Sequence, residues 1–208
     1  SMLGQSKVKN GDNSLWYKYQ YEIINKLQLE HLDTSKNSEH YRVWTNNQVI
    51  DIWKNKNGEF AGKLTCWVHE HVTNKRKKDE KRIYFKTNVI DQDSAHLLRN
   101  LFISSDILQL PTDDSIANWG HGFDGITYII EHSTENYYSF KTYWTPEIQD
   151  SLKEAILVKA FVYKAFDLAD ANSIWKSFEL EIPYECYAKG MGIICRNFIQ
   201  SQKKKKYR

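Results

Sequence analysis

The side chains best suited to chemistry in this sequence surround a glycine-rich stretch at residues 119–125. His121 and Asp124 lie within the stretch and Glu131 follows it, so the three could act as general acid and base in a hydrolase. A neighbouring strand would bring Lys141 close to Glu131. The pair could exchange a proton, but the favoured interpretation is a cross-strand ion pair.

The spacing of the glycines argues against a nucleotide cofactor. Gly120, Gly122 and Gly125 follow the order of a dinucleotide-binding loop, but they lead into a β-like segment, whereas that loop must open a helix. The sequence also lacks a nucleophile elbow, a phosphate-binding lysine loop and the helix motif of zinc proteases. Cys66, beside Trp67 in an apolar run, is predicted to be a core thiol. No cofactor is therefore expected.

A second candidate is a metal site at His69 and His71. Two histidines separated by one residue of a strand point to the same face and could share one metal ion. Such a site needs a third ligand, and Cys66 would point to the opposite face of the strand. The favoured interpretation is a pair of ordinary strand histidines, with metal binding as the alternative.

Aromatic residues supply a third kind of candidate. The chain holds 7 Trp, 13 Tyr and 9 Phe, and Tyr and Trp combine apolar area with a polar group, which suits surfaces that recognise protein or sugar. Any single Trp is expected in the core. Trp119, Tyr128 and Trp144, which accompany the glycine-rich stretch and the hairpin after it, are the predicted binding residues. Trp119 and Tyr128 would also line the cleft of the hydrolase alternative.

These candidates depend on a sheet to position them. Alternating β-rich segments predict an α+β fold of mainly antiparallel strands, arranged as a meander of hairpins. A long helix is expected over 146–168, because Thr145 can cap it and Pro146 can occupy its first position. A shorter helix is expected over 94–103. Residues 17–29 favour a strand, although their spacing also fits a helix. The later strands are expected at 41–44, 49–53, 62–72, 83–85, 126–132, 137–144, 178–187 and 193–198.

One predicted turn brings two cysteines together. A turn centred on Gly190-Met191 pairs residue 189 with 192, and therefore Cys186 with Cys195. Facing residues in neighbouring strands approach disulfide geometry. We predict a disulfide if the protein is exported, or two packed thiols if it is cytosolic.

Another turn is expected at Asn57-Gly58, a dipeptide typical of hairpins. A strict two-residue turn there would place Asp51 opposite Leu64 on one face of the sheet. A longer loop or a bulge is therefore the better interpretation.

Length and composition bound the domain organisation and the partners. The 208 residues predict one domain at 15–200, between a loose leader at 1–14 and a basic tail at 201–208. Within the leader, Ser1-Met2 is typical of the residue pair that remains after an affinity tag is cleaved. Five positive charges of a net +3 lie in the tail, so the body carries about −2 and no nucleic-acid partner is expected. No apolar run reaches about 18 residues, so no membrane span is expected. The oligomeric state stays open.

One composite pattern resembles a known kind of protein. It consists of Trp119-x-x-Gly122-Phe123-Asp124-Gly125-x-x-Tyr128-x-x-Glu131 followed by Lys141-x-Tyr143-Trp144-x-Pro146. This pattern resembles a family of uncharacterised small bacterial proteins, many of which look secreted, periplasmic or lipid-anchored. The resemblance implies a periplasmic or extracellular location, with the cytoplasm as the alternative, and implies no activity.

The sequence therefore favours a non-enzymatic binding protein of the bacterial envelope. By analogy with other small domains that lack a catalytic motif, it would be an immunity or accessory protein that engages a protein partner through the exposed side of its sheet. The alternatives are the hydrolase with His121, Asp124 and Glu131, and a metal- or carbohydrate-binding module.

Overall fold

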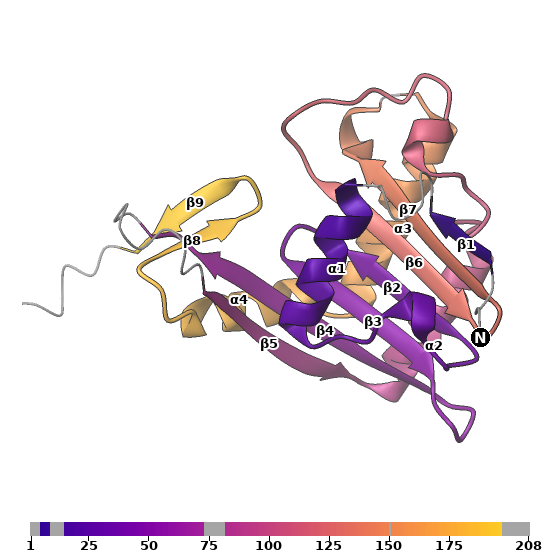
Figure 1. The fold of residues 1–208 in the computed structure, drawn as a ribbon, viewed down its shortest axis with the longest axis horizontal. Coiled ribbons are helices and arrows are strands. Elements are labelled where there is room, and N and C mark those ends of the chain that lie inside the picture. The colour runs from indigo at the N-terminus through magenta and orange to yellow at the C-terminus, as the bar shows by residue number, and fades with distance from the viewer. Residues whose placement is uncertain (1–4, 9–14, 73–81, 150, 197–208) are drawn as a thin grey trace, which may run out of the picture.

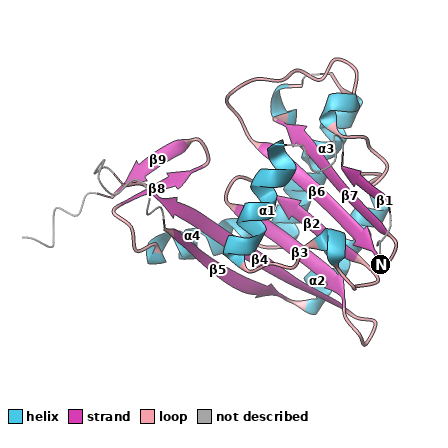
Figure 2. Ribbon diagram, in the orientation of Figure 1, coloured by secondary structure: helices cyan, strands magenta, loops and turns pink. Residues whose placement is uncertain are grey.

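The fold, obtained as a computed structural model, has the expected α+β architecture (Figures 1 and 2). The structure describes residues 5–8, 15–72, 82–149 and 151–196. In these residues the strands are β1 Gln5–Val8, β2 His40–Trp44, β3 Gln48–Lys54, β4 Phe60–Glu70, β5 Ile83–Ile90, β6 Thr127–Thr134, β7 Tyr137–Trp144, β8 Cys186–Lys189 and β9 Gly192–Cys195. The α-helices are α1 Leu15–Leu27, α2 Gln92–Ser104, α3 Lys153–Leu168 and α4 Ala171–Glu181.

These strands form one sheet in the order β1-β7-β6-β2-β3-β4-β8-β9, with β5 on the other side of β4. β1 pairs with β7 in parallel, and the remaining pairs are antiparallel. β8 pairs with the last two residues of β4, beyond the point where β3 stops pairing with it. The β8–β9 hairpin therefore lies next to the turn between β2 and β3.

Helices lie on both faces of the sheet. α1 crosses one face, in front of the sheet in Figure 1, and α2, α3 and α4 lie behind it. In front, Ile23 and Leu27 of α1 pack in one buried cluster with Trp44. Behind, Phe102 of α2 and Phe161 of α3 pack in another cluster around β2 and its neighbours. All of β2 is buried, so the centre of the sheet offers no surface to a partner.

The strand prediction for residues 17–29 is wrong, because α1 occupies this segment. Its buried positions are Gln20, Ile23, Ile24 and Leu27, which recur at helical spacing. The apparent two-residue alternation came from aromatic residues that the helix leaves half-exposed, including Tyr19 and Tyr21.

The long helix expected over 146–168 begins later, and a second helix follows it. Pro146–Ile148 is one turn of 3-10 helix, and α3 starts at Lys153. Thr145 adopts a left-handed conformation and does not cap the helix through its side chain. The strand expected at 178–187 is wrong over its first half, since α4 extends to Glu181.

The predictions for the two hairpin turns are confirmed. Residues 54 and 60 pair across the Asn57-Gly58 loop, so Asp51 faces Lys63 and not Leu64. Residues 189 and 192 pair across Gly190-Met191, and a disulfide joins Cys186 to Cys195.

Gln5–Val8, expected in a loose leader, forms β1, and the shorter expected helix is α2. The basic tail at 201–208 lies outside the described residues.

Candidate functional site

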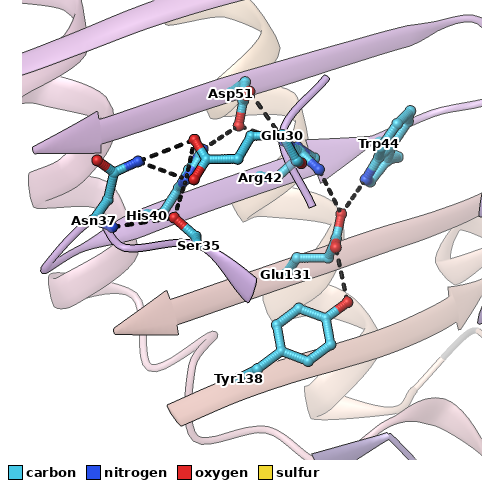
Figure 3. Close-up of polar contacts among 9 residues, drawn as sticks. All are labelled: Glu30, Ser35, Asn37, His40, Arg42, Trp44, Asp51, Glu131 and Tyr138. Atoms are coloured by element: carbon cyan, nitrogen blue, oxygen red, sulfur yellow. Dashed lines mark hydrogen bonds and ion pairs between the residues drawn. The ribbon is translucent and has the colours of Figure 1, made fainter. Parts of the chain in front are cut away.

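A buried network of ionisable side chains occupies the middle of the sheet beneath α1 (Figure 3). Arg42 on β2 lies between Asp51 on β3 and Glu131 on β6, since the three residues are register partners across the strands. The Arg42 guanidinium donates to both oxygens of Asp51 at 3.1 Å, and its Nη1 lies 3.7 Å from Glu131 Oε2. The side chains of Arg42 and Glu131 are fully buried. Three charged groups thus share a water-poor interior.

The remaining contacts complete the network. Trp44 Nε1 and the Tyr138 hydroxyl both donate to the Glu131 carboxylate. His40 Nε2 lies 2.6 Å from Asp51 Oδ1. Burial alone would raise the pKa of Asp51, but Arg42 and His40 outweigh it and hold this pKa well below its usual range. Asp51 is therefore ionised at every physiological pH.

This network stabilises the fold and is closed to a substrate. The pocket that Glu131 lines together with Tyr138 has a volume of about 10 Å³, room for about one water molecule. Arg42 also donates to the Glu30 carbonyl at 2.9 Å, which attaches the segment after α1 to the sheet. We assign the network a structural role.

The structure separates the three residues of the predicted hydrolase site. His121 lies 3.6 Å from Asp114, and both side chains are about half exposed. Asp124 is exposed, whereas Glu131 belongs to the buried network. Lys141 pairs in register with Ile130, so it points to the face of the sheet opposite Glu131, where its Nζ donates to the Leu108 carbonyl.

The predicted aromatic residues divide between interior and surface. Trp119 is buried and donates from Nε1 to the Trp144 carbonyl at 2.9 Å. Tyr128 is buried, and its hydroxyl donates to Glu147 at 2.7 Å. Trp144 remains partly exposed and lines a surface pocket.

The histidines and the third cysteine show no sign of a reactive or metal-binding site. His69, one residue before the end of β4, pairs in register with Ala188, and the backbone N–H of His71 donates to the Cys186 carbonyl. Within the described residues, no three side chains of His, Cys, Asp or Glu gather closely enough to hold a metal ion. Cys66 is fully buried, which confirms its predicted core position, and burial raises the pKa of its thiol to about 11.

A groove lies at one end of the sheet, and we call it the β2–β3 groove. Three pockets with volumes of about 570, 500 and 760 Å³ adjoin there through shared residues. The turn at 45–48, the glycine-rich stretch and the β8–β9 turn each contribute to the first pocket. The residues shared by the first two pockets are Asn46, Gly125, Gly190 and Met191.

Exposed apolar side chains surround this groove. Phe123 is fully exposed, and Met191 is exposed over most of its surface. Trp16 and Tyr19 of α1, each about half exposed, line the same pocket as Phe123. Such a concentration of exposed aromatic and methionine side chains is typical of interaction sites.

Hydrogen bonds and close contacts hold the walls of the groove in place. The Gln149 side chain both donates to the Gly120 carbonyl and accepts from its N–H, each at 2.9 Å. A Cβ on Gly122 would lie 2.8 Å from the Trp144 ring, and one on Gly125 would lie 2.0 Å from Thr145 Oγ1. The stretch can therefore reach the end of β7 only because these positions are glycine.

The opposite wall is the β8–β9 hairpin, which pairs with the end of β4 and makes side-chain contacts with the body. Its Gly190 N–H donates to Asn47 Oδ1 at 2.6 Å. Lys189 Nζ lies 4.8 Å from the centre of the Trp175 ring and 3.2 Å from Glu179. The disulfide closes the other end of the hairpin. These contacts fix the position of this wall relative to the sheet.

Sequence reasoning missed the network and most of the groove. A signal for the network was present, because Arg42 and Asp51 each interrupt a short apolar β-rich run, and buried charges need partners. The groove had no such signal, since one of its pockets joins Trp16 and Tyr19 of α1 to turns more than 100 residues away.

The chain matches no known family model, and no curated protein is detectably similar to it. No helix in the described part of the chain is long and apolar enough to cross a membrane.

Proposed function

We propose that this chain is a non-enzymatic binding protein of the bacterial envelope, an immunity or accessory protein, and that it holds a protein partner in the β2–β3 groove. The observation that carries the proposal is the fully exposed Phe123 beside the exposed Met191, on walls that hydrogen bonds hold in place. Aromatic and methionine side chains are enriched at the centres of protein interfaces, where a few of them supply most of the binding energy.

The distribution of ionisable groups supports binding over catalysis. His121, Asp124 and Glu131 have different partners and different degrees of burial, so they do not form one acid–base site. The first pocket of the groove is lined by apolar surface, amide side chains and backbone, together with Asp124 and Lys189. These are the components of a recognition surface.

The disulfide supports the part of the proposal that concerns location. Disulfides persist in the periplasm and outside the cell, whereas cytosolic thiols are kept reduced. Because Cys186 and Cys195 close the hairpin that carries Met191, an oxidising compartment would preserve the groove.

A sugar ligand is the second candidate for the same groove. Asn46, Asn47 and Asn172 line the first pocket together with Trp175. Amide groups beside an aromatic ring can bind hydroxyl groups and the apolar face of a sugar.

The test compares Phe123→Ser with the control Leu180→Ser, which removes another largely exposed apolar side chain from α4, outside the groove. Tagged proteins are purified from the native cell, and the product of the neighbouring gene is titrated against each by calorimetry. We expect a stoichiometric complex with the wild type and the control, and an affinity at least about tenfold weaker for Phe123→Ser, since hot-spot residues contribute about 2 kcal/mol or more. Recovery of no stoichiometric partner, or equal weakening in the control, would contradict the proposal. Binding of a cell-wall oligosaccharide that Asn46→Ala abolishes would favour the sugar.

A further inference from the structure

An open strand edge runs along one border of the sheet, at β5 (Figure 1). In the described part of the chain, β5 pairs with β4 alone, and we call its other side the β5 edge. β5 has eight residues, whereas β1 and β9, at the two ends of the strand order, have four each. Edge strands are usually protected by proline, by a bulge or by several charges, because an open edge can pair with another chain. β5 contains no proline and one charged residue, and its register with β4 runs from Ile83 to Ile90 without a bulge.

Two hydrogen bonds of β4 show which backbone groups point outward at the β5 edge. The Glu70 N–H donates to the Arg82 carbonyl at 2.8 Å, which makes this a hydrogen-bonded pair directly before β5. Hydrogen-bonded and non-hydrogen-bonded pairs alternate in antiparallel strands, so every second residue of β5 points its N–H and C=O away from β4. The Trp67 N–H agrees, because it donates to the Asn47 carbonyl beside β3 and not to its register partner Phe85. The residues with outward backbone groups are therefore Ile83, Phe85, Thr87 and Val89.

The β5 edge offers apolar surface and no unpaired charge. Val89 is 83% exposed, and Thr87 is exposed as well. The ammonium group of Lys86, the one charged residue of the strand, donates to both oxygens of Glu181 at 2.7 and 2.9 Å. A neutral strand therefore meets no repulsion at this edge, whereas a charged strand finds no free charge of opposite sign.

We propose that the β5 edge binds a second copy of this chain, with β5 antiparallel to β5, so that the two sheets continue into each other across a twofold axis. The neutral strand that the edge favours is then supplied by the chain itself. A closed twofold pair, in which the same surface of both copies is used, is the commonest association of identical chains.

The sequence of β5 selects one register for this pairing. With Thr87 opposite Thr87 of the second copy, outward backbone groups meet outward backbone groups, and each Phe85 faces the exposed Val89 of the other copy. Aromatic–β-branched and Thr–Thr pairs are both favourable between neighbouring strands. Lys86 then faces Asn88. The adjacent register of the same backbone phase would place the two Lys86 side chains opposite each other, which is unfavourable.

The first experiment is sedimentation velocity of the full chain, with its disulfide intact, from about 1 μM to about 1 mM, since one pair of strand edges forms a small interface. We expect a dimer that grows with concentration. Val89→Pro removes an N–H that each copy donates to the Phe85 carbonyl of the other. Proline is tolerated on an edge strand where its nitrogen faces solvent, so the variant should fold and dimerise at least about tenfold more weakly. The matched control is Val89→Thr, which keeps the N–H and the β-branched shape and should retain most of the affinity.

Hydrogen exchange of the wild-type amides tests the register and requires no variant. As the dimer forms, the N–H groups of Phe85, Thr87 and Val89 should become protected. The even-numbered amides of β5, which bond to β4, should exchange slowly in monomer and dimer alike. The Ile83 N–H should stay unprotected, because the register places Asp91, just before α2, opposite it.

A monomer over the whole concentration range would overturn the proposal, and so would equal dimer affinities of Val89→Pro and Val89→Thr. A dimer that protects none of the outward amides of β5 would overturn it as well. None of these results bears on the β2–β3 groove, because no residue of β5 lines its pockets.

Discussion

Replacing Arg42 by Met keeps most of the side-chain volume of the buried network and removes its only guanidinium. The substitution deletes the two contacts with Asp51 at 3.1 Å, the approach to Glu131 at 3.7 Å and the hydrogen bond to the Glu30 carbonyl. The Asp51 and Glu131 carboxylates, with side-chain exposures of 7% and 0%, then lose the guanidinium between them, and Asp51 keeps only its contact with His40 at 2.6 Å. Breaking a buried ion pair by removing one partner costs about 3–5 kcal/mol, so we expect a loss of this size in the free energy of unfolding.

A matched control is available at the surface. Arg82 donates to both oxygens of Glu70 at 2.7 Å, a shorter pair than any that Arg42 makes, but its side chain is 70% exposed. Exposed pairs contribute about 0–1 kcal/mol, so Arg82→Met should destabilise the protein by no more than that. The comparison separates the effect of burial from that of contact length, because the exposed pair has the shorter contacts and is still expected to contribute less to stability.

The assay is urea unfolding near neutral pH, monitored by tryptophan fluorescence, with the disulfide intact in both variants. The triple variant Arg42→Met, Asp51→Asn, Glu131→Gln removes the orphaned charges and should recover at least about 2 kcal/mol, since the loss arises from uncompensated charge and not from volume. The reasoning is refuted if Arg42→Met and Arg82→Met differ by less than about 1 kcal/mol, or if the triple variant is no more stable than Arg42→Met.

Three further predictions follow from single contacts. Gly125→Ala should destabilise the protein by at least about 1 kcal/mol more than Gly58→Ala in the same urea assay. Both positions have positive φ, but only a Cβ on residue 125 would lie 2.0 Å from Thr145 Oγ1. Equal losses of stability in the two variants would contradict this reasoning. Replacing Cys186 and Cys195 by Ser should cost about 2 kcal/mol, with faster hydrogen exchange in the β8–β9 hairpin and unchanged exchange in β2. His132 must stay neutral in the fold, since burial lowers its pKa from 6.5 to about 4. Stability should therefore be unaffected by this group above pH 6.5 and fall by up to about 3 kcal/mol as the pH drops from 6.5 to 4, and His132→Gln should flatten that slope.

The elements that could be predicted from sequence are those whose signals are local. The β6–β7 hairpin, α2 and the facing cysteines depend on alternation, helical spacing and turn position, and all three are present in the structure. The α+β class follows from the same signals.

The elements that could not be predicted depend on contacts distant in sequence. Thr145-Pro146 is a strong helix start, but Thr145 Oγ1 is engaged with the backbone of Ile126, and Gln149 is engaged with Gly120. These contacts hold residues 145–149 against the glycine-rich stretch, so α3 starts only at Lys153. α4 was missed for a different reason. Pro183 marks the end of this helix, but the β-rich composition of 178–187 favoured a strand that runs through it.

The buried network and the groove are connected through α1, which gives the network a consequence beyond stability. Tyr17 of α1 packs on Tyr138 and Phe140, next to the Glu131 carboxylate, and the Arg42 guanidinium holds the Glu30 carbonyl just after the helix. The first turns of the same helix supply Trp16 and Tyr19 to the groove. Loss of Arg42 should therefore loosen the helix and weaken the partner binding that we propose for the groove. Loss of Phe123 removes contact area at the surface and should weaken binding while stability stays unchanged. If α1 forms part of the groove, the Arg42 variant should weaken binding as well. If α1 takes no part, the Arg42 variant should lose stability and keep its affinity for the partner.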